Sequence, residues 1–171
     1  SCSLVGSEMC IRDRYYITSP VIMKLLEDRL PITSITVMVQ KEAAERLCAQ
    51  PGTRECGAVS AAVQYYAEPE ILFEVSRGSF MPAPNVDSAV IQLRIRKEPP
   101  VDVHDEALFF RVIRAAFAQR RKTAVNSISN TLHMSKQQVT DAFEQAGVRA
   151  NSRAEALTLP EFAAIVNQLA D

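Results

Sequence analysis

The sequence predicts an α/β unit followed by a small all-α helical domain. Stretches with helical and with strand periodicity alternate from Tyr15 to Arg96. The segment Lys97-Glu98-Pro99-Pro100 then interrupts both patterns, because proline continues neither a helix nor a central strand. Beyond it the strand signal disappears and helical stretches follow. We therefore expect an α/β unit over residues 15–98 and a helical domain over residues 103–171.

The α/β unit is predicted to open with a helix, because Ser19 and Pro20 suit its N-cap and first position and an apolar stripe runs on to about Leu30. We then expect strands over residues 32–40, 69–76 and 86–96, and helices over residues 41–50 and 57–67. The first strand is short and rich in β-branched residues, which is typical of a buried strand. In the last strand, apolar and more polar residues alternate, which predicts one buried and one exposed face.

The helical domain is predicted to contain four helices, over residues 105–119, 123–132, 135–146 and 159–170. Ser135 and Gln138 have the spacing of a capping box at the start of the third helix. Gly147 is the residue expected to end that helix.

Composition and charge exclude several classes of protein. The 171 residues include 19 basic and 20 acidic ones, a formal charge of -1, so a nucleic-acid partner would need a local basic patch. No apolar run reaches the roughly 18 residues of a membrane span. The five glycines form no phosphate-binding loop, and the sequence lacks the common hydrolase and kinase motifs.

The cysteines have no metal-binding spacing, because Cys2, Cys10, Cys48 and Cys56 form no C-x-x-C pair and are not grouped with the two histidines. We therefore expect no metal site. The chain begins without the pattern of a secretory signal, so we expect reduced thiols in a cytoplasmic protein.

The first fourteen residues, SCSLVGSEMCIRDR, follow neither a helical nor a strand period. They resemble translated sequencing-adapter sequence that recurs at the ends of metagenomic reading frames. The alternative is a native disordered leader. In either case we interpret residues 1–14 as standing outside the fold.

Two aromatic residues are candidates for a base-binding site. Phe80 opens a loop that Pro82 and Pro84 stiffen and that leads into a strand, a place where α/β proteins often contact ligands. Tyr15 precedes the first helix, and enzymes that modify a nucleobase hold the extruded base between aromatic or apolar faces. The alternatives are that Phe80 packs in the core and that Tyr15 covers the sheet edge.

A basic stretch is the candidate for nucleic-acid contact. It contains five positive charges and no acidic residue, contributed by Arg111, Arg114, Arg120, Arg121 and Lys122. Arg111, Arg114 and Arg121 would share one face of a continuous helix. Such a stripe in a neutral protein suits phosphate contacts, and the alternative is a solvated helix face.

Taken together, these stretches resemble the small-subunit ribosomal RNA adenine dimethyltransferases, the KsgA/RsmA-like family. The resemblance covers residues 15–169. Its specific pieces are YYITSP at 15–20, TVMVQKEAAERL at 36–47, ECGAVSAAVQYY at 55–66, GSFMPAPNVDSAVIQL at 78–93, FAQRRKTAVNSI at 117–128 and RAEALTLPEF at 153–162.

The resemblance implies a Rossmann-like methyltransferase domain that uses S-adenosylmethionine, followed by a helical domain that helps to grip RNA. The implied reaction dimethylates the exocyclic amine of two adjacent adenosines in small-subunit rRNA. Tyr15 then corresponds to the tyrosine of the family's N-L-P-Y motif, which stacks on the flipped base, and Phe80 to a second stacking aromatic. The implied partner is the small-subunit rRNA or the assembling subunit, and we expect a monomer.

The chain departs from the family at this motif, because Arg12, Asp13 and Arg14 stand where asparagine, leucine and proline are expected. The family's glycine-rich cofactor loop lies upstream of the matching region. We therefore interpret the chain as the carboxy-terminal half of the methyltransferase domain plus the helical domain, with no useful cofactor binding or activity of its own. The alternatives are a large-subunit rRNA methyltransferase of the macrolide-resistance type and a non-catalytic RNA-binding or ribosome-assembly module.

Overall fold

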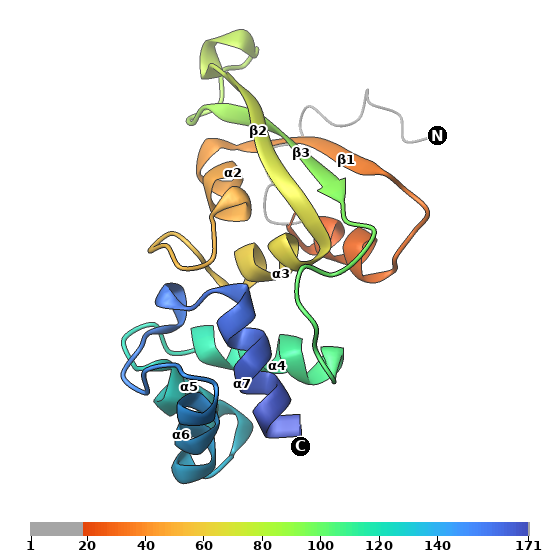
Figure 1. Cartoon of the computed structure of the whole chain (residues 1–171). Coiled ribbons are helices and arrows are strands. Elements are labelled where there is room, and N and C mark those ends of the chain that lie inside the picture. Colours follow the sequence, from red (N-terminus) through yellow and green to blue (C-terminus); the bar gives the residue numbers. More distant parts are fainter. Residues whose placement is uncertain (1–18, 171) are drawn as a thin grey trace.

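The structure, a computed structural model, describes residues 19–170. In Figure 1 an α/β unit lies above a group of helices. The α/β unit consists of a first helix (residues 19–27), β1 (Ser34–Gln40), α2 (Lys41–Cys48), α3 (Ala58–Tyr66), β2 (Ala67–Val75), the short 3-10 helix η2 (Arg77–Ser79) and β3 (Ser88–Ile95). The helical part consists of α4 (Glu106–Phe117), α5 (Ala124–Leu132), α6 (Lys136–Gln145), the short η3 (Ala154–Ala156) and α7 (Leu159–Ala170).

The labelled α-helices and strands confirm the predicted order, and their ends differ from prediction by at most two residues. The two short 3-10 helices are not predicted by the sequence. The first helix ends at residue 27. Ser19 and Pro20 are both described and both helical, so Ser19 lies within this helix and is not the N-cap that the sequence predicts. No helix among the described residues is long and apolar enough to cross a membrane.

The sheet has the strand order β1-β3-β2, and β3 pairs antiparallel with both neighbours. β1 and β2 therefore run parallel to each other on either side of β3. Pro69 lies within β2, which is an edge strand of this sheet, and an edge is where a strand tolerates a missing N–H donor.

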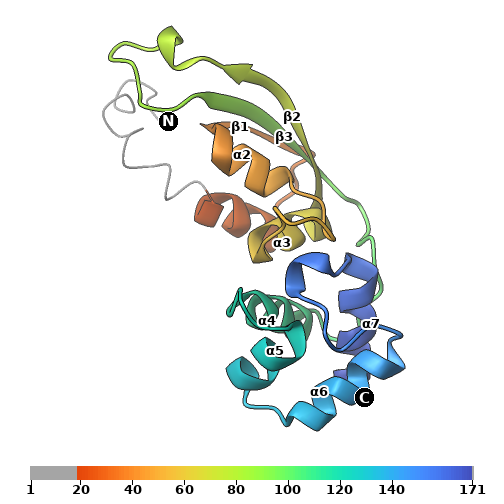
Figure 2. The same cartoon turned by 90° about the vertical axis from the view of Figure 1, so that its left-hand side faces the viewer.

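One face of the sheet is covered by the first helix, α2 and α3, as Figure 2 shows from the side. Ala89, Ile91 and Leu93 of β3 are buried beneath these helices, which confirms the predicted alternation along this strand. The core of the unit is formed by Ile22, Leu26, Ile35, Val39, Ala44, Leu47, Val63, Ala67, Ala89, Ile91 and Leu93.

The opposite face of the sheet corrects one prediction. The sequence indicates that the first strand is buried, but only alternate residues of β1 are, with Ile35 and Val39 facing the helices. Thr36 is exposed on the other face and Met38 is 40% exposed. The β-branched run resembles a strand covered on both sides, but within residues 19–170 nothing covers this second side.

The helical part is built around a second core, and α3 belongs to both. Ala61 and Tyr65 of α3 pack with the buried residues of α4, α5, α6 and α7, whereas Val63 packs beneath the sheet. The division of the chain into residues 15–98 and 103–171 stays a prediction, because α3 precedes that boundary and contributes to the core beyond it.

Side-chain hydrogen bonds cap three helices of this part, and of these the sequence predicts the cap at Ser135. The side chains of Asp105, Thr123 and Ser135 accept bonds from backbone N–H groups in the first turns of α4, α5 and α6. After α6 the backbone of Gly147 has φ +72°, and the N–H of Val148 donates to the carbonyl of Phe143 at 2.8 Å. Gly147 therefore ends this helix as predicted.

The end of α4 corrects a second prediction, since the helix stops at Phe117 and not at residue 119. The buried hydroxyl of Ser127 donates to the carbonyl of Ala115 at 2.6 Å, and the N–H of Gln119 donates to the same hydroxyl at 3.1 Å. The hydroxyl thus occupies the place of the next helical hydrogen bond, and the helix ends there.

Replacing Ser127 with alanine is expected to lower the free energy of unfolding by about 1–3 kcal/mol, because two backbone groups at the end of α4 lose their buried partner. Urea denaturation followed by circular dichroism measures this change. S34A is the matched control, because the Ser34 side chain lies on the exposed start of β1. Equal stability of S127A and the parent chain would show that the inserted hydroxyl does not hold this helix end.

Candidate RNA-contacting surface

The loop between β2 and β3 contains Phe80 and is held by hydrogen bonds around Asp87. The Asp87 carboxylate accepts from the N–H of Arg77 at 2.9 Å, and its carbonyl accepts from the N–H of Lys41 at 3.0 Å. The guanidinium of Arg77 donates to the carbonyl of Asn85 across the loop at 3.3 Å. These contacts tie both ends of the loop to each other and to the start of α2.

Phe80 itself is half-buried. The side chain of Phe80 is therefore not buried in a core, and part of it stays accessible to a ligand. Tyr15, the other predicted aromatic contact, lies outside the described residues. The predicted pairing of these two rings therefore stays a prediction.

The five basic residues of the predicted stripe are all exposed. Arg111 and Arg114 lie on α4, but Arg120, Arg121 and Lys122 lie in the turn between α4 and α5. The prediction that Arg121 continues one helical face is therefore wrong, because Ser127 ends α4 before it. The five cations are therefore divided between a helix and a turn and do not form a stripe along one helix.

The structure adds two arginines that the sequence reasoning missed. The turn after Lys122 is held against the segment of residues 149–153, because the N–H of Ala124 donates to the carbonyl of Ser152 at 2.8 Å. The exposed Arg149 and Arg153 lie in this segment. A short stretch with two arginines and no acid, VRANSRA, was the available signal. We call these residues the cationic surface: Arg111, Arg114, Arg120, Arg121, Lys122, Arg149 and Arg153.

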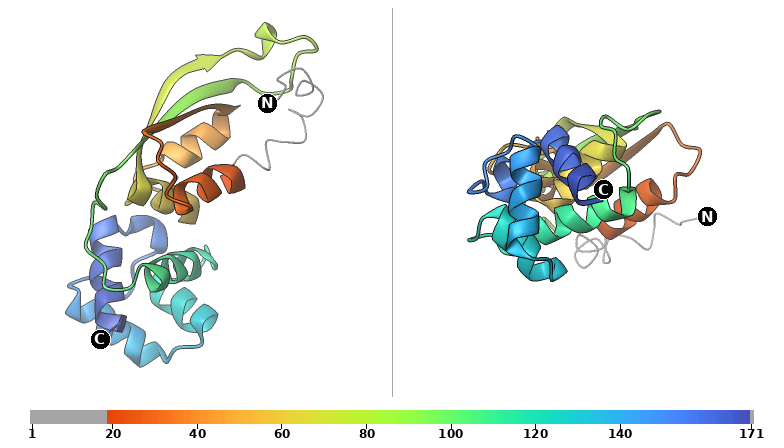
Figure 3. Two further views of the ribbon diagram at one scale, coloured as in Figure 1. Left: turned by 90° about the vertical axis from the view of Figure 1, so that its right-hand side faces the viewer. Right: turned by 60° about the horizontal axis from the view of Figure 1, so that its bottom comes forward.

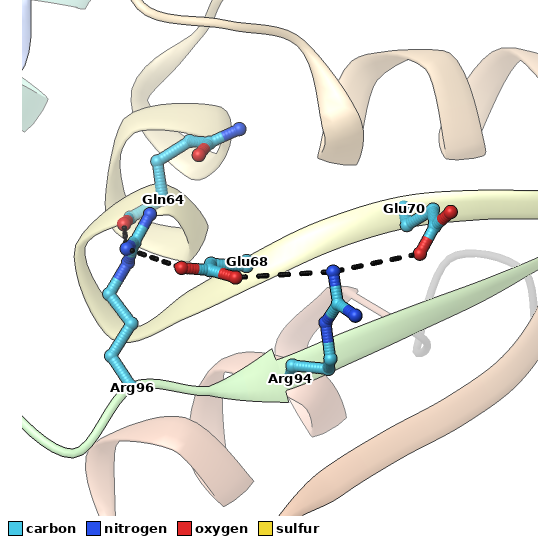
Figure 4. Close-up of polar contacts among 5 residues, drawn as sticks. All are labelled: Gln64, Glu68, Glu70, Arg94 and Arg96. Atoms are coloured by element: carbon cyan, nitrogen blue, oxygen red, sulfur yellow. Dashed lines mark hydrogen bonds and ion pairs between the residues drawn. The ribbon is translucent and has the colours of Figure 1, made fainter.

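No residue of the cationic surface forms an ion pair with another described residue. The α/β unit is different, since most of its exposed cations are paired. Figure 4 shows Arg94 between Glu68 and Glu70, at 4.0 and 3.8 Å, and Arg96 at 3.0 Å from Glu68. Arg96 also donates to the carbonyl of Gln64. Unpaired cations attract a polyanion more strongly than neutralised ones, so the helical part has the better surface for phosphates.

The two parts of the molecule meet at a cluster around Glu106, the first residue of α4. One oxygen of its carboxylate lies 2.6 Å from the guanidinium of Arg29 and accepts from the Tyr65 hydroxyl at 2.9 Å. Burial, and then the neighbouring Glu106, raises the pKa of Tyr65, so its hydroxyl stays a donor. Beside it the ring of Tyr66 stacks on that of Phe110, with centroids 5.3 Å apart.

A shallow cavity of about 240 Å³ lies at the same junction, between the end of the first helix and the end of β3. Arg29, Lys97 and Tyr66 are among its lining residues. Burial raises the pKa of Tyr66 to about 12, so this hydroxyl is neutral at physiological pH.

The described cysteines, Cys48 and Cys56, are free thiols. Burial raises the pKa of each to about 11. Both are therefore protonated at neutral pH and poorly suited to act as nucleophiles. No group of His, Cys, Asp and Glu side chains that could hold a metal ion occurs within the described part of the chain.

The structure does not bring the two candidate contact regions together. The β2–β3 loop and the helices α4 to α6 lie at opposite ends of the molecule in Figures 1 and 3. A single ligand that touches both regions must therefore extend along the length of the molecule, as a polymer does.

The chain belongs to the ribosomal RNA adenine dimethylase family, which matches residues 14–171. It is 52% identical over 158 residues to ribosomal RNA small subunit methyltransferase A of Geobacillus sp. (strain WCH70), an alignment of 91% of this chain and 54% of the relative. It is 48% identical over 155 residues to the protein of that name from Oceanobacillus iheyensis, covering 90% and 53%. The chain thus spans about half the length of these curated relatives.

The fold is also similar to solved structures. A dimethyladenosine transferase from Plasmodium falciparum superimposes with a TM-score of 0.69 at 22% identity, covering 88% of this chain and 62% of that one. The 23S rRNA methyltransferase ErmE gives a TM-score of 0.65 at 22% identity, covering 91% and 62%. At this level of identity the likeness establishes the α/β methyltransferase fold alone.

Replacing Glu106 with alanine is expected to destabilise the chain by about 1–2 kcal/mol, mostly through the Tyr65 hydroxyl, because the exposed pair with Arg29 is screened by water. Urea denaturation measures the change. E106Q keeps an acceptor for Tyr65 and should cost less than E106A. E42A removes an exposed ion pair with Arg46 and should change stability by less than about 0.5 kcal/mol. Equal effects of E42A and E106A would contradict a special role of Glu106.

Proposed function

We propose that this chain is the carboxy-terminal part of an S-adenosylmethionine-dependent rRNA adenine dimethyltransferase that acts on small-subunit rRNA. The identity of about half its residues with relatives named ribosomal RNA small subunit methyltransferase A supports this function. The observation within the structure that carries it is the cationic surface, whose exposed residues form no ion pair with a described acid.

The α/β unit is, in this proposal, the carboxy-terminal half of a larger Rossmann-like sheet. β1 pairs on one side with β3, and no other described strand pairs with its second edge. On the face away from the helices, Met38, Val90 and Phe73 form a cross-strand row, and Phe73 is 56% exposed. A free edge and an exposed apolar row are features that neighbouring structure normally covers and that otherwise favour aggregation.

The described residues do not fit the cofactor. β1 passes directly into α2 at Lys41, and the loop after β2 contains the single glycine Gly78. Neither strand end therefore offers the glycine-rich loop that lets a backbone approach such a ligand closely. The one carboxylate of the β2–β3 loop, Asp87, is occupied by the N–H of Arg77. We place cofactor binding in the part of the protein outside this chain.

The residues of this chain would act by holding RNA. The cationic surface contacts phosphates, which sets the position of the RNA without reading its sequence. Phe80, in the braced β2–β3 loop, stacks on the target adenine, with Tyr15 as the second aromatic contact. Holding the adenine in a fixed orientation is the contribution that methyl transfer needs from these residues, because positioning lowers the barrier without acid–base chemistry.

The large-subunit alternative has weaker support. The likeness to the 23S rRNA methyltransferase ErmE is one of fold at 22% identity, whereas the relatives of about 50% identity have small-subunit names. A non-catalytic RNA-binding module would share the cationic surface. Comparing the complete polypeptide with this chain for methyl transfer separates that module from the enzyme.

Removing three cations together, as R120A/R121A/K122A, is expected to weaken binding of a small-subunit rRNA hairpin and to lower the slope of log affinity against log salt by about 2. Each cation that contacts a phosphate releases counterions from the RNA. With fewer such contacts, fewer counterions are released and the affinity depends less on salt. Fluorescence anisotropy at several salt concentrations measures both quantities.

The matched control is K24A/K41A/R46A, which removes the same charge from exposed cations that are paired with acids. This triple variant should bind RNA nearly as the parent chain does. A similar loss in both triple variants would mean that net charge, and not the cationic surface, governs binding.

Isothermal titration of the purified chain with S-adenosylmethionine is expected to give no measurable binding heat, because the described residues lack a loop for the cofactor. A complete relative, such as the Geobacillus protein, serves as the positive control. Saturable one-to-one binding by this chain would contradict the placement of the cofactor site outside it.

A further inference from the structure

Met81 is by far the most exposed large apolar side chain among the described residues. It is 97% exposed, whereas the next in order, Phe73, is 56% exposed. Its neighbour Phe80 is half-buried, so the two adjacent side chains differ in how much of each is open to solvent. Met81 lies beyond η2 in the loop between β2 and β3. In Figure 2 this loop forms the end of the hairpin farthest from the helical part.

The loop presents Met81 from a braced backbone. Pro82 and Pro84 fix the φ angles of two of the following residues. The hydrogen bonds from Arg77 to Asp87 and Asn85 join the two sides of the loop below Met81. An exposed apolar side chain on a braced loop can make contacts without first ordering the backbone, which reduces the entropy cost of binding.

Single exposed apolar residues are common on protein surfaces, but their distribution here is uneven. All the large apolar side chains that are exposed belong to the part of the chain before residue 97, and none to the described helical part. They are Val21, Leu30, Met38, Ile71, Leu72, Phe73, Met81 and Val86. The side chains available for apolar contacts therefore lie in the α/β unit, and the cations available for phosphate contacts lie in the helical part.

We propose that Met81 is a wedge that inserts into the RNA base stack beside the target adenosine, an inference that rests on the proposed function. A base that leaves its stack opens a gap, and proteins that unstack bases often insert an apolar side chain at the step. Methionine suits this role, because its unbranched thioether adapts its shape and contacts aromatic rings favourably.

Phe80 and Met81 are adjacent in the loop and differ in exposure, the first half-buried and the second almost fully exposed. The two side chains can therefore contact different parts of one RNA segment. Phe80 stacks on the extruded adenine, and Met81 occupies the step that the adenine leaves.

The test uses the whole chain and a hairpin RNA with two adjacent adenosines in its loop. The fluorescent analogue 2-aminopurine replaces the base next to them, and a dye at the 5′ end reports binding by anisotropy. Unstacking raises 2-aminopurine emission. We expect the parent chain to raise it about threefold, M81A to lose most of that rise, and M81L to keep it, with the three affinities within about twofold.

M38A is the matched control, because Met38 is a second exposed methionine, on the sheet and away from the loop. It should retain the full emission change. An unchanged rise in M81A, or binding of the parent chain without any rise, would overturn the wedge. A loss of affinity in M81A as large as that in R120A/R121A/K122A would overturn it too, by making Met81 a general RNA contact. Absence of RNA binding by the parent chain would instead refute the proposed function.

Discussion

The burial of α3 on both of its sides is the constraint on which the arrangement of the molecule depends. A helix that is apolar all round must lie inside a protein, and each residue from Ser60 to Tyr65 is buried. Its polar side chains are satisfied locally, since the Ser60 hydroxyl donates to the carbonyl of Arg46 at 2.6 Å. Because one short rigid helix belongs to two cores, the sheet and the helical part cannot turn freely about the linker.

This shared helix gives the protein two surfaces of different character in a fixed relation. The end that contains the sheet and the β2–β3 loop exposes apolar side chains and pairs most of its charges, whereas the helical end exposes unpaired cations. Phosphates are attracted over several ångströms, but apolar contacts form only when surfaces meet. The cationic surface is therefore suited to capture and orient RNA, and the loop is suited to act on bases once the RNA is held.

The sequence predicts that the candidate site is a phosphate-binding region, but it does not predict how the cations of this site are arranged in space. Five cations without an acid between them indicate a phosphate-binding region whatever the fold. Their arrangement depends on Ser127, whose hydroxyl ends α4, and on the bond between Ala124 and Ser152, which brings Arg149 and Arg153 alongside. Neither contact has a local sequence signal, because each joins segments that only the folded core brings together.

The sequence by itself determined the order, type and approximate ends of the labelled α-helices and strands, because periodicity, N-caps and helix-ending glycine are local properties. Only the tertiary structure decided which faces are covered, as the open side of β1 shows. It also decided that Glu106 joins Arg29 and Tyr65 across the junction. Burial and long-range hydrogen bonds depend on residues that are close in space but far apart along the chain. A local sequence pattern does not specify which residues these are.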